Sequence, residues 1–147
     1  MTQIGIGKIL YMNTNQKIVF LFADYAVRVI AGRHFPELKK LKPIRSIETI
    51  NAALSAVYVA RYAAAVSDIT DTAYNAAYAI ANAAAAAANA ATHVAIIATA
   101  ADAANAADYA AYAAYAAASR ATDVRINAYP IDVRALINIA LDPDRYW

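Results

Sequence analysis

Apolar residues recur every three or four positions in the first part of the chain, which is the spacing of an amphipathic α-helix. This pattern predicts a helix from Gln16 to Arg33, preceded by the cap-forming residues 13–15 and stopped by Gly32. Residues 1–15 carry no comparable pattern, and we expect a loosely packed N-terminal segment there. The positions that carry the helical spacing are Ile18, Phe22, Tyr25 and Val29.

The same spacing returns in two later stretches. One predicts a helix from Pro43, whose fixed φ suits a first turn, to Val66, after a linker bounded by Pro36 and Pro43. The other predicts a last helix over residues 131–141, which the Asp142-Pro143 pair ends. The apolar positions expected to face inward are Ile47, Ile50, Leu54, Val57, Tyr58 and Tyr62 in the first of these helices, and Val133, Leu136, Ile137 and Ala140 in the second.

A stretch dominated by alanine lies between these helices. Of the 46 residues from Ala73 to Ala118, 28 are alanine. Alanine has the highest helix propensity, so the whole stretch is predicted to be helical. One straight helix would be about 70 Å long, which a domain of this size could not cover, so we expect a helical hairpin. The favoured position for the turn is Asn89–Thr92, and the second is Ala100–Ala104 around Asp102, because Asn, Thr and Asp cap helices.

These patterns predict an all-α protein, a compact bundle of five to seven helices in a single domain, residues 1–147. Composition supports this fold class, because three glycines and four prolines in 147 residues supply too few turns for a β or nucleotide-binding α/β fold. It also argues against catalysis. There is no cysteine, there are only two histidines, and the sequence has no carboxylate pair near a histidine, no phosphate-binding loop and no metal-ligand spacing. We therefore expect no catalytic residue, no metal and no cofactor.

Charge is scarce and unevenly placed. The net charge of +2 is too small for a typical nucleic-acid-binding protein, so no nucleic-acid partner is expected. Residues 72–101 are free of charge for 30 positions, long enough for a membrane span. The stretch is mostly alanine with interspersed Asn, Thr and His, which are unfavourable in lipid, so no membrane association is expected. No signal peptide is recognised and cysteine is absent, which favours the cytoplasm.

Three tyrosines and two acids stand out within the alanine-rich stretch, with no Lys or Arg between Tyr62 and Ser119. The rings could pack across grooves of small residues with their hydroxyls at the surface. Alternatively, they form an exposed strip that binds a basic protein partner, since tyrosine is enriched at binding hot spots. Because so little charge is available to face water, a homo-oligomer is also expected. The candidate partner-binding residues are Asp102, Asp108, Tyr109, Tyr112 and Tyr115.

Asparagine recurs every seven residues at Asn75, Asn82 and Asn89, so these side chains share one helix face. That face is either a solvated polar side or a row of hydrogen bonds to a neighbouring helix or partner. Asn89 and His93 are also the candidate lining of a small-ligand site between helices, although a lone histidine in an alanine-rich helix is more often structural.

Several segments together resemble a known family. They are the run Phe22–Ile30, the Pro-Ile-Arg-Ser-Ile-Glu sequence at residues 43–48 and the Thr-His-Val-Ala sequence at residues 92–95, which precede or lie in a long alanine block. Over residues 18–118 the chain resembles the alanine-rich, all-helical immunity proteins of bacterial toxin systems, with relatives in phages and prophages. The resemblance implies a non-enzymatic protein that binds and neutralises a toxin, or a phage-borne relative that acts on a host factor. It assigns no residue roles. The alternatives are a structural, self-assembling helical protein and a protein that binds a small ligand between helices.

Overall fold

The computed structural model describes residues 13–66, 82, 85, 86, 88, 89, 91, 99–119 and 129–147. Six α-helices, one π-helix and one 3-10 helix occur within these residues, and no strand does. The predicted all-α bundle is therefore confirmed. Residues 1–12 of the expected loose N-terminal segment lie outside the described residues.

The first predicted helix is a continuous helical run with three types of turn. It begins as the α-helix α2 (Thr14–Asp24), widens into the π-helix η1 (Tyr25–Ile30) and ends as the 3-10 helix η2 (Ala31–Arg33). A capping box fixes its start, because Asn13 Oδ1 accepts from the Gln16 backbone N–H at 2.7 Å and Gln16 Oε1 accepts from the Asn13 N–H at 2.9 Å. The prediction is confirmed, with a start two residues earlier.

Gly32 does not end the helix in the predicted way. No glycine among the described residues has a positive φ, so Gly32 is not a left-handed cap. A Cβ at this position would lie 3.3 Å from the Cα of Lys39, which shows that glycine permits a close approach between η2 and the short helix α3 (Pro36–Lys39). The predicted linker between Pro36 and Pro43 is thus partly helical.

The second long helix, α4 (Ile47–Val66), begins four residues after Pro43 rather than at it. Ser46 caps it instead, because its hydroxyl accepts from the Thr49 N–H at 3.2 Å while the Thr49 hydroxyl accepts from the Ser46 N–H at 2.9 Å. The predicted inward face is only partly correct, since Ile47, Tyr58 and Tyr62 are exposed. The buried residues of α4 between positions 47 and 63 are Ile50, Ala53, Val57 and Ala60.

The alanine-rich stretch is broken, as predicted, directly before the second expected position, Ala100–Ala104, and residues 100–104 are themselves helical. Asn89 and Ala91 are helical, so the favoured turn is wrong at these positions, and Thr92 lies outside the described residues. Thr99 is not helical, and the helix α6 (Ala100–Ser119) begins directly after it. Thr99 and Asp102 cap this start reciprocally: the Thr99 N–H donates to Asp102 Oδ2 at 2.8 Å, and the Asp102 N–H donates to Thr99 Oγ1 at 3.2 Å.

The last predicted helix is confirmed as α7 (Tyr129–Leu141), and a further turn, α8 (Pro143–Tyr146), follows it. Leu136 and Ile139 are buried, whereas Ile137 and Ala140, both predicted to face inward, are exposed. The periodicity failed here because the buried stripe of α7 includes a charged residue, Asp132.

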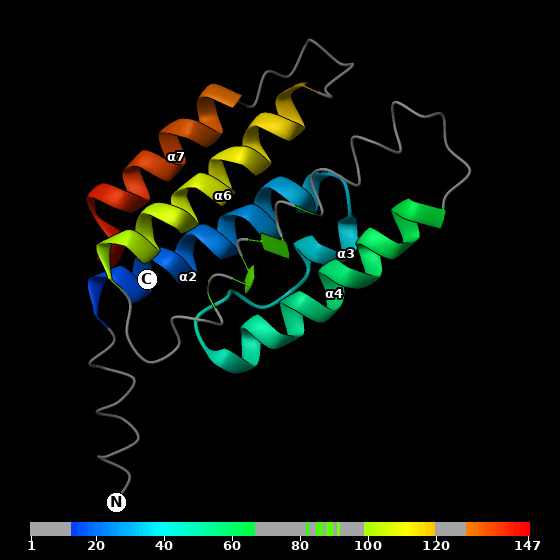
Figure 1. Ribbon diagram of the computed structural model, residues 1–147, viewed down its shortest axis with the longest axis horizontal. Coiled ribbons are helices and arrows are strands. Elements are labelled where there is room, and N and C mark those ends of the chain that lie inside the picture. Colours follow the sequence, from blue (N-terminus) through cyan, green and yellow to red (C-terminus); the bar gives the residue numbers. More distant parts are fainter. Residues whose placement is uncertain are drawn as a thin grey trace, which may run out of the picture.

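Figure 1 shows α2, α6 and α7 side by side, with α6 running in the direction of α2 and α7 returning antiparallel. The contact between α2 and α6 is the most extensive, and α7 packs on both. α4 lies on the other side of α2, and α3 contacts α4 there. On the α6 side the core consists of alanines, whose small side chains allow backbones to approach closely. These alanines are Ala106, Ala110, Ala113 and Ala114.

Candidate functional site

The tyrosines of α6 are exposed rather than buried. Tyr109, Tyr112 and Tyr115 keep 41%, 57% and 60% of their surface open to solvent. Residues 108, 112 and 115 recur at i, i+4 and i+7, so Asp108 shares one face of α6 with the two most exposed rings. The core behind them is filled by alanine and does not need the rings. These exposures exclude full burial of the rings, and they fit both an exposed strip and rings that pack across small residues with their hydroxyls at the surface.

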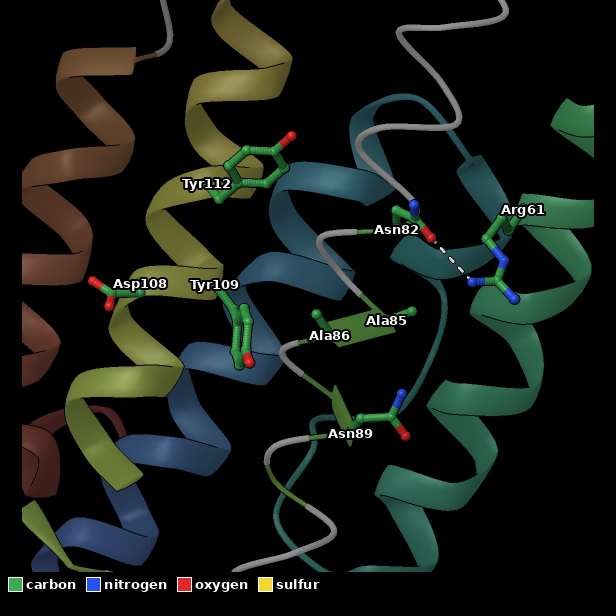
Figure 2. Close-up of a pocket in the computed structure, with 8 residues that line it drawn as sticks. All are labelled: Arg61, Asn82, Ala85, Ala86, Asn89, Asp108, Tyr109 and Tyr112. Carbon is green, nitrogen blue, oxygen red and sulfur yellow. Dashed lines mark hydrogen bonds between the residues drawn. The ribbon is translucent and has the colours of Figure 1, made fainter. Parts of the chain in front are cut away.

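A groove of about 570 Å³ runs beside this face of α6, between α6 and α4 (Figure 2). Its volume lies within the range of ordinary ligand sites, roughly 300–1,000 Å³. Asp108, Tyr109 and Tyr112 line it from α6, as Arg61 does from α4. The remaining lining residues come from the first part of the alanine-rich stretch and are Asn82, Ala85, Ala86 and Asn89. We call this set of eight residues the α4–α6 groove.

The repeated asparagines form hydrogen bonds to α4. Asn82 Oδ1 accepts from an Arg61 guanidinium N–H at 3.0 Å, and Asn89 Nδ2 donates to the Tyr58 hydroxyl at 3.0 Å. Of the two interpretations of the seven-residue repeat, the row of hydrogen bonds to a neighbouring helix is therefore correct at these positions. Asn75 lies outside the described residues.

Arg61 changes the electrostatic character expected of this surface. The sequence suggested an acidic, aromatic strip without a compensating cation, because no basic residue occurs in the following 58 positions. In the fold, Arg61 lines the same groove as Asp108, and its guanidinium lies 4.9 Å from the centre of the Tyr58 ring. The α4–α6 groove is thus bipolar, with a cation on the α4 side and an anion on the α6 side. Its position as the last basic residue before the uncharged stretch was the only sequence signal for Arg61.

The other candidate residues are placed differently. Asp102 is half-buried at the start of α6, where it caps the helix, and it does not line the groove. Tyr115 continues the exposed face of α6 beyond the groove. Asn89 lines the groove, as proposed for a ligand site, whereas His93 lies outside the described residues.

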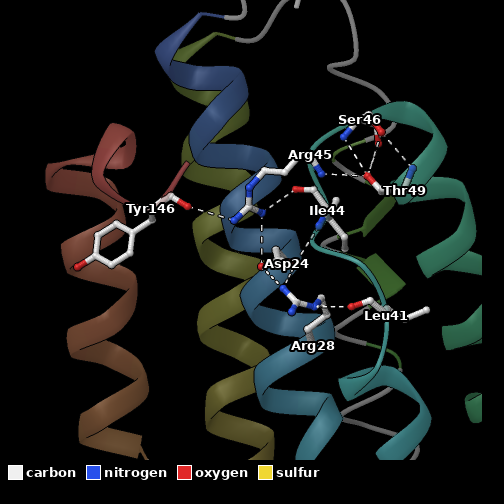
Figure 3. A network of polar contacts seen from close by, with 8 residues as sticks. All are labelled: Asp24, Arg28, Leu41, Ile44, Arg45, Ser46, Thr49 and Tyr146. Atoms are coloured by element: carbon white, nitrogen blue, oxygen red, sulfur yellow. Dashed lines mark hydrogen bonds and ion pairs between the residues drawn. The ribbon is translucent and has the colours of Figure 1, made fainter.

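A second polar cluster surrounds Asp24 and joins the segment before α4 to α2 (Figure 3). Arg28 donates to both carboxylate oxygens of Asp24 at 3.0 Å, and the Ile44 N–H donates to Oδ1 at 2.9 Å. Arg45 approaches Oδ2 at 3.5 Å and donates to the Tyr146 carbonyl at 3.1 Å. Two guanidinium groups share the one carboxylate, and the hydrogen bonds to it hold the segment before α4 against α2.

A third cluster lies between η1, η2 and α7. Asp132 is only 1% exposed and accepts from the Tyr25 hydroxyl at 2.7 Å and from two guanidinium nitrogens of Arg33. Burial, and then the hydrogen bond to Asp132, raise the pKa of Tyr25 well above its ordinary value. No buried polar side-chain atom among the described residues lacks a partner, so this cluster also has a structural role.

The described residues contain neither a membrane-spanning helix nor a cluster of metal ligands. No helix among them is both long and apolar enough to cross a bilayer. No group of three or more potential metal-binding side chains comes together in this part of the chain.

Comparison with known proteins gives no match to a family model, to a curated protein or to a solved structure. The resemblance to toxin-immunity proteins therefore stays a prediction, and the groove and the exposed face of α6 are the features on which a functional proposal can rest.

Proposed function

We propose that the protein is a non-enzymatic protein-binding module that uses the exposed face of α6 and the α4–α6 groove as its contact surface. The observation that carries this proposal is the exposure of Tyr112 and Tyr115 on a helix otherwise built mainly from alanine. Large rings on such a helix add no core packing, whereas tyrosine supplies contact area and a hydroxyl at low entropic cost in an interface.

The resemblance to immunity proteins extends the proposal to a toxin, or to a host factor for a phage-borne relative, as the partner. An immunity protein works by covering its target, so it requires a contact surface and no catalytic group. The absence of cysteine supports action in the cytoplasm. Asp108 on the exposed face would attract a basic partner, and the rings would anchor it.

The test is a binding measurement with the protein encoded beside this gene, by calorimetry or surface plasmon resonance. We expect Tyr112→Ala to raise the Kd about 30-fold, the equivalent of about 2 kcal/mol, without lowering the melting temperature. Asp108→Asn is expected to slow association and flatten its salt dependence.

The matched control is Tyr62→Ala, which removes a tyrosine on α4 that is even more open to solvent than Tyr112, 71% against 57%, and lies outside the groove. Its affinity should equal that of the unchanged protein. A Tyr112→Ala variant that loses thermal stability and keeps its affinity would show that the ring is packing, and the proposed surface would then be wrong.

A further inference from the structure

The outer face of α7 carries an apolar strip on which none of the described helices packs. Ile131, Ile137 and Leu141 are 66%, 52% and 78% exposed. At 100° per residue they fall within one third of the helix circumference, and the exposed Arg134 lies among them. We call these four residues the α7 strip. Exposed apolar side chains grouped in this way usually mark a contact surface.

Charges of opposite sign lie within and beyond this strip. Arg134 is exposed in the first half of α7, and Asp142 is exposed directly after its end. Neither side chain forms an ion pair within the described part of the chain. Eight residues of helix separate them, or about 12 Å along the axis. The strip is therefore an amphipathic segment with a cation toward its start, apolar residues in its second half and an anion at its end.

The α4–α6 groove has the complementary arrangement. Asp108 lies on its α6 side and forms no ion pair among the residues described. Arg61 lies on its α4 side, where its contacts with Asn82 and Tyr58 leave further guanidinium N–H groups. Between the two charges lie the rings of Tyr109 and Tyr112 and the methyl groups of two alanines (Figure 2).

We propose that the α7 strip of one copy of the chain occupies the α4–α6 groove of the next copy. In this contact Arg134 pairs with Asp108, Ile137 and Leu141 cover the tyrosine rings, and Asp142 faces Arg61. Opposite charges thus meet at both ends of an apolar centre, which fixes the direction of the inserted helix. The inference goes beyond the proposed function, because it names the occupant of the groove when no other partner is bound.

The positions of the two surfaces determine the kind of assembly. The helices α7 and α4 lie on opposite sides of the α2–α6 pair (Figure 1). One copy can therefore use both surfaces at once, each toward a different neighbour. Such a contact between unlike surfaces is heterologous, and it produces a ring or an open chain of copies rather than a two-fold dimer.

The test uses charge reversal and sedimentation velocity on the purified full chain, from micromolar to hundreds of micromolar protein. We expect the unchanged protein to form species larger than a dimer as its concentration rises. Asp108→Lys and Arg134→Asp should each weaken association at least about tenfold, because each places like charges in contact. The variant with both changes should associate within about threefold of the unchanged protein, since the exchanged pair is again opposite.

Mixing the two single variants gives an independent readout. The intact strip of the Asp108→Lys chain meets the intact groove of the Arg134→Asp chain, and the changed strip and changed groove of the two chains also carry opposite charges. Equimolar mixing should therefore restore species larger than a dimer, with the two variants alternating, whereas each variant alone stays weakly associated. The controls are Lys42→Glu and Glu37→Lys, which change exposed charges outside both surfaces and should leave association unchanged. Circular dichroism confirms that each variant is folded.

Three results would overturn the proposal. The first is a monomer at the highest concentration. The second is association that Arg134→Asp weakens and Asp108→Lys does not, which would indicate α7 pairing with α7. The third is a double-reversal variant as weak as the single ones. None of these results concerns the measured affinity of Tyr112→Ala for another protein, so failure here is distinguishable from failure of the proposed function.

Discussion

The buried carboxylate of Asp132 links two segments that are 99 residues apart, because it binds Arg33 at the end of the first helical run and Tyr25 within it. A charge at 1% exposure is stable only when its partners satisfy it. Removing one partner leaves part of the carboxylate without a hydrogen bond, so each contact contributes more than an exposed ion pair would.

Tyr25→Phe should therefore lower the free energy of unfolding by about 2 kcal/mol at neutral pH, which is typical of a hydrogen bond to a charged group. The pKa of Tyr25 is raised in the folded state, so the proton is held more tightly there than in the unfolded chain. The stability it supplies is complete below the unfolded pKa of about 10 and is lost as the pH rises above that value. Urea unfolding should show that the free energies of unfolding of Tyr25→Phe and of the unchanged protein differ less above pH 10 than at neutral pH. A difference independent of pH would contradict this account.

At the scale of the element, the start of α6 depends on two side chains. Thr99 and Asp102 satisfy each other's backbone N–H groups, and no glycine or proline marks this helix start. Of the two acids predicted to bind a partner, Asp102 therefore stabilises the start of α6, whereas Asp108 lines the groove.

Thr99→Ala should reduce the free energy of unfolding by about 1 kcal/mol, the usual loss when a helix cap is removed. Thr99→Ser keeps the hydroxyl and should stay within a few tenths of a kcal/mol of the unchanged protein. Thermal or urea unfolding of both variants measures this difference. Equal losses in the two variants would show that the methyl group of the threonine, and not its cap, stabilises the protein.

The elements could be predicted where periodicity or a cap was visible in the sequence. The helical run ending at Arg33 and the end of α7 before Asp142 are of this kind. The favoured turn in the alanine-rich stretch was wrong at Asn89 and Ala91, because several Asn and Thr residues were equally good caps. The second expected position, around Asp102, lies directly after the break, where Asp102 and Thr99 cap the start of α6. In the site, Asp108 and the tyrosines were found from their spacing, whereas Arg61 joined them through a long-range contact that no local pattern encodes.

At the scale of the whole molecule, the C-terminal turn joins segments from both ends of the chain. Trp147 lies 6.1 Å from the Phe20 ring, with the Arg45 guanidinium 5.3 Å from the centre of its own ring. Lys17 pairs with Asp144 at 2.8 Å. α2, the segment before α4 and α8 are thus held at one point, which closes the bundle.

Trp147→Ala should lower the free energy of unfolding by about 2 kcal/mol, because it removes ring packing and two partly exposed cation–π contacts. Tyr146→Ala is the matched control, since Tyr146 binds Arg45 through its backbone carbonyl, which alanine retains. Tyr146→Ala should lower the free energy of unfolding by less than half as much as Trp147→Ala in the same denaturation experiment. If the two variants were equally destabilised, the indole would have no special role in closing the bundle.

The alanine helix α6 has a consequence for how such a protein can diversify. Its inner alanines pack in the core, while Ala101, Ala104 and Ala111 on its outer side are exposed and do not pack in the core. Alanine loses no rotamer freedom on folding, and larger helix-forming residues can replace it at exposed positions at little cost. The outer side of α6 is thus a regular array of interchangeable sites, on which a new recognition pattern can arise from a few substitutions while the scaffold beneath is inherited unchanged.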